Sequence, residues 1–401
     1  MAPGHPPFAM GIVMNVTVRS LLVAAAAALL VPAMSTAFAA DQPASSPTRG
    51  AATAAVAAQA GKIAPYHARF GRTQPLIAII GENSGTELTD YVIPYGVLQQ
   101  SGVARVMTVA TQPGPITMRP ALRIQPQATI AEFDADFPEG ADYVIVPAVV
   151  RRNDPALLAW IAAQGAKGGT IVSICDGALV VANTGLLKGH RATAHWATQA
   201  LRAKVYPDVH WVKNVRYVAD GRIVSSAGIS ASMPVSIALV EAIAGHDHAA
   251  TLAHELGVSD WSTAHNSDVF RPRFGVNLMA FVHTTYSNAH LHAMQRIGVP
   301  VAAGVDEIAL AFTADAYSRT GRSHAYALSA SDAPLQTRHG LTLLPDRVVG
   351  GANPVDRVLP AFDATPSARM LDQALAGIAQ RFGRSTAYGV ALDFEYPGFR
   401  K

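Results

Sequence analysis

Cys175, in the segment SICDGALVV (residues 173–181), is the only cysteine of this 401-residue chain. It lies between two apolar runs, which predict a buried strand, a sharp turn and then a helix. This strand–turn–helix context is typical of an elbow that presents a nucleophile. Ser173 and Gly177, two residues before and after the cysteine, are small, as so tight a turn requires.

A helix beginning just after Cys175 would direct its free N–H groups and the positive end of its dipole at the sulfur. We therefore expect a lowered thiol pKa. The backbone N–H of Asp176 would also donate to an oxyanion. Because a lone cysteine on a strand is more often a core residue, the prediction of a nucleophile depends on two further segments.

Those two segments supply an acid and a base. Asp90, in TELTDYVIP, begins a helix after the first strand and would assist proton movement; the alternative is a simple N-cap. His195, in RATAHWA, follows a short extended stretch and would serve as base or proton shuttle; the alternative is a packing residue.

The elements that must position these side chains alternate between strand and helix. Such alternation predicts a three-layer α/β/α sandwich with a mostly parallel, flavodoxin-like sheet. We expect strands at 75–81, 105–111, 142–150 and 170–174, an extended pair within 116–126, a hairpin at 215–228, and helices at 89–102, 154–169 and 232–245.

The second half resembles part of the first. Residues 299–346 repeat the order strand, helix, turn, strand seen from residue 75, with Ala309 in place of Asp90 and no second cysteine elbow. A helix at 368–383 and a strand at 386–397 are expected to follow. We interpret this half as a structural module for packing or for homodimerisation, because the polar residues of a site are missing from it.

The N-terminus predicts export. Arg19 precedes an apolar stretch at 20–34 and small residues that favour cleavage near Ala39 or Ala40. The mature protein would then be periplasmic or secreted, with no membrane partner. An uncleaved anchor is the alternative, and either Met1 or Met14 is the start.

The expected organisation is a signal peptide, a linker, a catalytic-type domain, a connector and a degenerate partial repeat, at residues 1–40, 41–73, 74–246, 247–298 and 299–401. The formal charge of +3 gives no reason to expect nucleic acid, and a single cysteine excludes an intrachain disulfide framework. His283, His290 and His292, with His254 and His265 nearby, match no standard metal motif, so we expect no metal and no cofactor.

Three segments carry a family resemblance: residues 173–196, LTDYVIP at 88–94, and the closing stretch 218–245. They resemble the ThiJ/PfpI family of the class I glutamine-amidotransferase-like fold. Within it, the isocyanide hydratases and the amidase-like sensor domains of AraC-family regulators are the most similar. The resemblance covers roughly residues 75–246. It implies that Cys175 is the elbow nucleophile, Asp90 the acid beside the thiol, and His195 the family's histidine.

Two departures from the family accompany this resemblance. Relatives often carry Pro-Gly-Gly where this chain has Pro147-Ala148-Val149, so the backbone donor for an oxyanion would come from Ala148. The paired helix-turn-helix units of the regulators have no counterpart in residues 247–401. The resemblance implies a cysteine-dependent hydrolase, hydratase or lyase acting on a small carbonyl, amide or isonitrile compound. The alternative is a ligand-binding or redox-sensing module without turnover.

Overall fold

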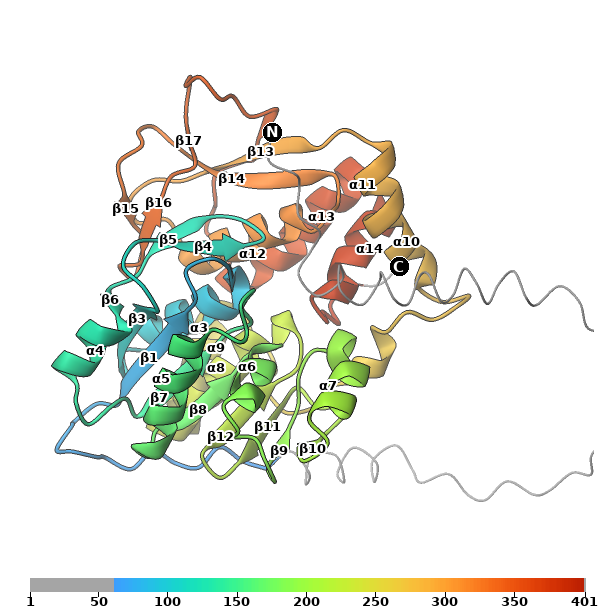
Figure 1. Cartoon of the computed structure of the whole chain (residues 1–401). Coiled ribbons are helices and arrows are strands. Elements are labelled where there is room, and N and C mark those ends of the chain that lie inside the picture. Colours follow the sequence, from blue (N-terminus) through green and yellow to red (C-terminus); the bar gives the residue numbers. More distant parts are fainter. Residues whose placement is uncertain (1–60, 400–401) are drawn as a thin grey trace, which may run out of the picture.

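The structure is a computed structural model that describes residues 61–399 (Figure 1). Its main sheet has the strand order β11-β12-β8-β7-β1-β3-β6 and is parallel except for the β11–β12 hairpin. The strands are β1 (Leu76–Gly81), β3 (Arg105–Ala110), β6 (Ala128–Thr129), β7 (Tyr143–Val146), β8 (Thr170–Ser173), β11 (Tyr217–Asp220) and β12 (Ile223–Ser226).

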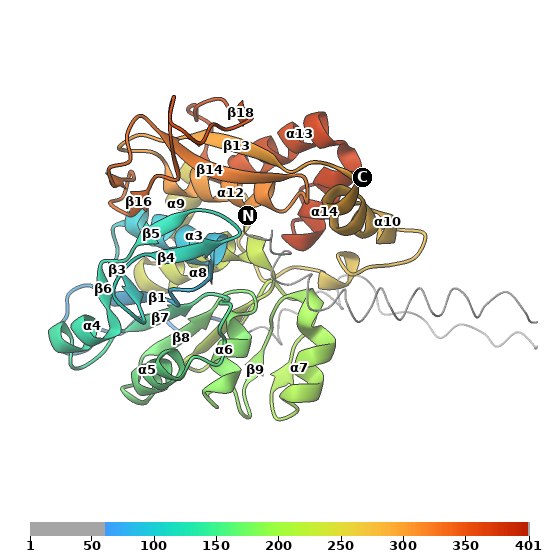
Figure 2. The ribbon, with the colours of Figure 1, turned by 45° about the horizontal axis from the view of Figure 1, so that its top comes forward.

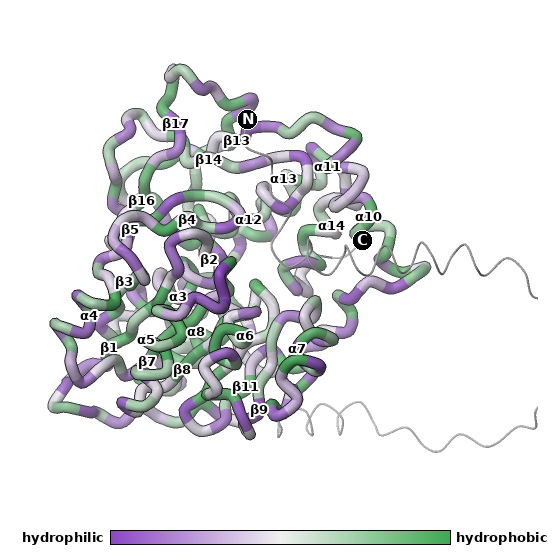
Figure 3. The backbone as a smooth tube through the Cα atoms, in the orientation of Figure 1, coloured by the Kyte–Doolittle hydropathy of each residue, from purple (hydrophilic) through white to green (hydrophobic). Residues whose placement is uncertain are grey.

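Both faces of this sheet are covered by helices. In β1, Ile77 and Ile79 belong to the core beneath α3 and α8, whereas Leu76, Ala78 and Ile80 face α4, α5 and α6. This two-sided burial confirms the predicted three-layer sandwich, and Figure 3 shows the apolar central strands. The helices are α3 (Leu88–Ser101), α4 (Ile130–Asp136), α5 (Pro155–Ala166), α6 (Gly177–Asn183), α7 (Gln199–Val205), α8 (Ser232–Ala244) and α9 (His246–Leu256).

The second part of the chain repeats this arrangement without the elbow. Its sheet has the order β17-β14-β13-β18, which corresponds to β6-β3-β1-β7 of the first. After β18, a connection that includes the 3-10 turn η5 (Ser367–Arg369) leads to two helices joined at Gly383, just as α8 and α9 are joined at Gly245. The elements are β13 (Gln295–Pro300), α12 (Glu307–Ser318), β14 (Ser323–Ser329), β17 (Arg347–Val348), β18 (Arg357–Val358), α13 (Met370–Phe382) and α14 (Arg384–Asp393).

We call residues 61–257 the first unit, 258–294 the connector and 295–399 the second unit. The two units pack through α3 against α12 (Figure 2). Gly96 makes this crossing possible, because a Cβ there would lie 2.6 Å from Cγ1 of Ile308. A five-stranded sheet also spans both units, since β16 of the second pairs with β5 of the first. Its order is β15 (Leu335–Gln336), β16 (Thr342–Leu344), β5 (Arg123–Gln125), β4 (Ile116–Arg119) and β2 (Thr86–Glu87).

Three sequence-based expectations differ from the structure. The strand expected at 386–397 is instead mostly α14, in which Ala387, Val390 and Ala391 are buried at helical spacing; the C-cap Phe394 is buried as well. Helix α9, placed in the expected connector, packs on α8 and α3. In the expected linker, residues 61–73 lie on the first unit, where Arg72 pairs with Asp142 at 2.9 Å.

The expected signal peptide at 1–40 and residues 41–60 of the expected linker lie outside the described residues. Among residues 61–399, no helix has the length and apolar character needed to cross a membrane.

Candidate functional site

Cys175 stands at the junction of β8 and α6 in a left-handed backbone conformation, with φ 55°. A non-glycine residue there is strained, and such strain concentrates at functional sites. The glycine at 177 is required, because a Cβ would lie 2.0 Å from the carbonyl oxygen of Val146. The elbow predicted from the sequence is therefore present.

The electrostatics of the thiol differ from the expectation. Burial raises the pKa of Cys175 well above its usual value, and the neighbouring carboxyl groups of Asp90, Asp176 and Glu87 raise it further. The backbone N–H of Asp176 faces the sulfur as predicted and acts in the opposite direction. The expected lowering is thus wrong, since a two-turn helix cannot offset burial among acids.

Asp90 lies in the first turn of α3 and is fully buried. Its Oδ2 accepts a hydrogen bond from the backbone N–H of Ala148 at 3.1 Å, while Oδ1 has no partner within the described chain. Burial raises the pKa of Asp90 well above its usual value, which favours the protonated form of the acid. Oδ1 is the oxygen free to carry that proton, since Oδ2 accepts the Ala148 N–H.

This arrangement settles two expectations. Asp90 does not cap α3, whose N-cap is Glu87. The Ala148 N–H, expected to serve an oxyanion, is instead given to Asp90. A backbone donor is therefore present at Ala148, but it faces the acid.

His195 lines the same cavity as Cys175, but both of its ring nitrogens are engaged by backbone groups. Nδ1 accepts from the N–H of Ala197 at 3.2 Å, and Nε2 donates to the carbonyl of Asp393 at 2.8 Å. A ring held in this way has no free nitrogen for the thiol. The expected role as base for Cys175 does not fit this geometry; His195 instead ties the second unit to the first.

The second unit also contributes the guanidinium group of Arg319, a residue that was not predicted from the sequence to lie at the site. Arg319 follows α12, is buried, and lines the cavity beside Cys175. It donates to Asp315 at 2.5 Å, to Asp393 at 2.6 Å, and to Glu87 of the first unit. The interpretation of this half as a packing module did not foresee that one of its side chains lines the cavity at Cys175. The only signal in the sequence was the four-residue spacing of Asp315 and Arg319.

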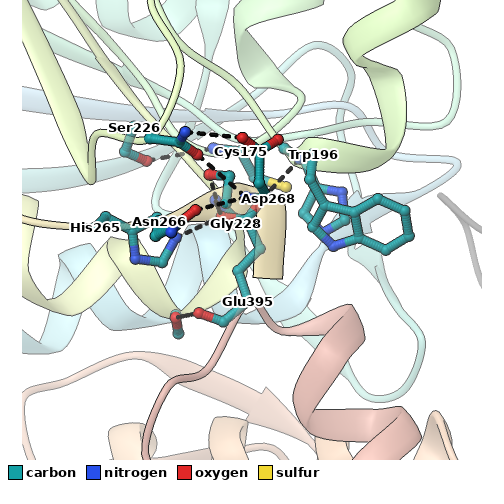
Figure 4. A network of polar contacts seen from close by, with 12 residues as sticks. Cys175, Trp196, Ser226, Gly228, His265, Asn266, Asp268 and Glu395 are labelled. Atoms are coloured by element: carbon teal, nitrogen blue, oxygen red, sulfur yellow. Dashed lines mark hydrogen bonds and ion pairs between the residues drawn. The ribbon is translucent and has the colours of Figure 1, made fainter. Parts of the chain in front are cut away.

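A second missed residue is Glu395, which inserts just after α14 into the first unit (Figure 4). Its carboxylate accepts from the N–H of Trp196 at 2.6 Å and of Gly228 at 3.1 Å, and from His265 at 2.9 Å and Ser267 at 3.2 Å. Burial raises the pKa of Glu395, but the contact with His265, the nearby His195 and the Trp196 N–H together lower it to about 2.

The cavity at the thiol has a volume of about 10 Å³, room for one water molecule at most. Its walls come from both units, so a substrate reaches the sulfur only if these walls move. The lining residues are Glu87, Ala148, Cys175, Asp176, His195, Ile229 and Arg319. In the described part of the chain, no cluster of three or more His, Cys, Asp or Glu side chains is arranged to hold a metal ion.

Comparison with known proteins agrees with this geometry. The model of the DJ-1/PfpI family matches residues 76–242. An isonitrile hydratase of Pseudomonas putida is 30% identical over 164 residues, which are 40% of this chain and 68% of the relative. The chain belongs to the DJ-1/PfpI family. The resemblance read from the elbow, Asp90 and His195 segments is thereby confirmed.

Other members of the DJ-1/PfpI family and proteins that contain related domains are also similar. The HTH-type transcriptional regulator CdhR of Pseudomonas aeruginosa is 33% identical over 91 residues, which are 23% of this chain and 27% of the regulator. A solved ThiJ/PfpI family protein from Pseudomonas syringae is 23% identical, with a TM-score of 0.42, and the match covers 49% of this chain and 83% of that protein.

The raised pKa of the thiol gives a first prediction. In the folded chain, the rate of alkylation of Cys175 by iodoacetamide should reach half its maximum above pH 8.5, near which free cysteine titrates. Mass spectrometry of samples quenched at each pH measures this rate. The urea-unfolded chain is the control and should titrate as free cysteine does. A half-maximum below pH 8.5 in the folded chain would contradict the prediction.

The anchored carboxylate gives a second prediction. Because the folded pKa of Glu395 is about 2 against 4.5 for the free group, it adds stability above pH 4.5 that is lost as the pH falls through 2. Glu395→Gln should lower the free energy of unfolding by roughly 3 kcal/mol at pH 7, from about 1.4 kcal/mol per pKa unit. At pH 3 the loss of unfolding free energy caused by Glu395→Gln should be less than half of that at pH 7. Urea unfolding of both chains at the two pH values measures this difference.

Glu139→Gln is the matched control, since the side chain of Glu139 is 53% exposed. It should change the unfolding free energy by less than about 0.5 kcal/mol. An equal loss for Glu395→Gln at both pH values would show that the carboxylate charge is not what stabilises this contact.

Proposed function

We propose that this protein is a thiol-dependent hydratase that adds water to small isonitriles, with Cys175 as nucleophile and Asp90 as proton donor. The observation that carries the proposal is the buried elbow thiol of Cys175 near the buried carboxyl of Asp90, whose Oδ1 has no partner in the described chain. The isonitrile hydratase of Pseudomonas putida, at 30% identity, is consistent with it.

An isonitrile suits such a pair because its terminal carbon accepts both a proton and a nucleophile. The Asp90 carboxyl gives its Oδ1 proton to this carbon while the sulfur of Cys175 bonds to it, and the thiol proton passes to Asp90. The product is a neutral thioimidate, R–N=CH–S. No separate thiolate has to form first, so the raised pKa of the thiol is no obstacle.

Water completes the reaction. Its oxygen bonds to the thioimidate carbon and its two protons go to the nitrogen and, through Asp90, to the leaving sulfur. The C–S bond then breaks to release the formamide R–NH–CHO and the free thiol. Isonitrile and water are the only reactants consumed.

Hydrolysis of an amide fits the site less well. It begins by forming an oxyanion, which needs backbone donors. The N–H of Ala148 is already bonded to Asp90, and the cavity walls carry the carboxyl groups of Glu87 and Asp176. An isonitrile has no oxygen, so its first step avoids this requirement.

The second candidate is a ligand-binding module without turnover, as in the sensor domains of regulators. The small volume of the cavity favours it, because a closed site admits a ligand only after a conformational change. Redox sensing is disfavoured, since oxidation follows thiolate character and the pKa of Cys175 is raised.

The third prediction tests the proposed reaction. The full chain incubated with a small alkyl isonitrile should produce the corresponding N-alkylformamide. Proton NMR measures the rate of its formation. Cys175→Ser and Asp90→Asn should each lower kcat/KM by at least about 100-fold, because each removes a reacting group. Asp332→Asn, at an exposed position of the second unit, is the matched control and should leave it unchanged.

Two outcomes would contradict the hydratase. A rise in Tm with the isonitrile but no formamide would support the ligand-binding module. Formamide production that survives Cys175→Ser would remove the thiol from the mechanism.

We further propose that the protein is exported through its N-terminal segment. Arg19, the apolar stretch and the small residues at 37 and 39 support this proposal. As a fourth prediction, protein recovered from the periplasmic fraction of a Gram-negative host should begin at Ala40 or Asp41 by N-terminal mass spectrometry. A β-lactamase expressed in the same cells controls the fractionation. Recovery only in the cytoplasm, or an intact N-terminus in the periplasm, would contradict cleavage.

A further inference from the structure

The connector carries an exposed apolar surface that belongs to neither unit. Half of the large hydrophobic side chains exposed in the described chain lie between residues 274 and 294. Phe274, at 94% exposure, is the most exposed of them. We call this set the connector patch: Phe274, Val276, Met279, Tyr286, Leu291 and Met294.

The inner face of the connector holds the patch in place. The chain from 278 to 291 is helical, with α10 (Leu278–Val282), a π-helical segment η4 (His283–Ser287) and α11 (Asn288–Leu291). Phe281 packs edge-on against Trp196 of the first unit, and Asn288 donates to Thr320 and Thr386 of the second. Met279, Tyr286 and Leu291 are therefore exposed on an element anchored on both units, while Phe274, Val276 and Met294 lie directly before and after it.

The segment that carries the patch contains basic residues but no acidic ones. No Asp or Glu occurs from Val269 to Val305, a stretch that contains Arg271, Arg273 and Arg296. Arg271 and Arg273 are exposed and flank Phe274 closely in the sequence. Arg271 pairs with Asp268 at 3.4 Å, just before the patch. An apolar tip beside exposed arginines complements an anionic lipid surface, where apolar side chains enter the headgroup region and cations meet phosphates.

We propose that the connector patch docks on an anionic lipid bilayer, with Phe274 inserted and Arg271 and Arg273 at the headgroups. A second copy of the chain fits less well, because a two-fold contact would bring the same arginines together. The proposal is independent of the hydratase reaction, and it replaces the expectation of no membrane partner after cleavage with peripheral binding.

The test reads the environment of the patch itself. In the full chain carrying Cys175→Ser, Phe274→Cys is labelled with the fluorophore NBD, and Val349→Cys is labelled as the matched control. Val349 is 65% exposed and follows β17, outside the connector. Both chains are mixed with vesicles of phosphatidylglycerol and phosphatidylcholine, or of phosphatidylcholine alone. Unchanged circular dichroism confirms folding, and Met279→Cys is a second probe site within the patch.

The expected result is a blue shift and at least a twofold rise in NBD emission at position 274 with phosphatidylglycerol vesicles. The emission should not change at position 274 with phosphatidylcholine vesicles, or at position 349 with either kind of vesicle. Arg271→Glu with Arg273→Glu should abolish the shift, and added salt should weaken it.

Five results would overturn the proposal. The first three are no shift with the anionic vesicles, an equal shift at position 349, and a shift that survives the charge reversal. The third of these would point to the N-terminal segment. A shift without vesicles would indicate a second copy if it grows with protein concentration, or cover by the chain itself if it does not. A shift only with an oligonucleotide would assign the patch to nucleic acid.

Discussion

The buried guanidinium of Arg319 is the contact on which the site depends. It joins Glu87 of the first unit to Asp315 and Asp393 of the second, and removing one partner of such a buried pair costs about 3–5 kcal/mol. Burial raises the pKa of Glu87, and the guanidinium of Arg319 opposes this rise. The cluster keeps the second unit docked where it forms a wall of the cavity.

The same docking explains the protonation of the site. Arg319 of the second unit covers the cavity at Cys175, and burial is the largest cause of the raised pKa of Cys175 and of Asp90. A more open site would favour a thiolate and a carboxylate instead. The chemistry available to this elbow thus follows from the unit that covers it, and less from the short helix behind the sulfur.

Local patterns predicted the first unit well. The apolar runs, the small residues around Cys175 and the placement of Asp90 on α3 are properties of contiguous segments, and all are present in the structure. What the sequence could not reveal depends on contacts between units. The direction of Arg319, the insertion of Glu395 and the engagement of His195 by Asp393 link residues far apart in the chain. The prediction of a strand at 386–397 was wrong. The helical period of this segment shows only in the spacing of Ala387, Val390 and Phe394.

The second unit has kept the strands and the paired helices of the first but lacks the segment that would hold a second elbow. It therefore serves as a tethered partner, covalently joined to the site that it completes. Its local concentration at the site is set by the connector and does not fall on dilution. Two separate subunits would lose their shared wall as they dissociate, whereas this chain keeps its site whole as a single molecule.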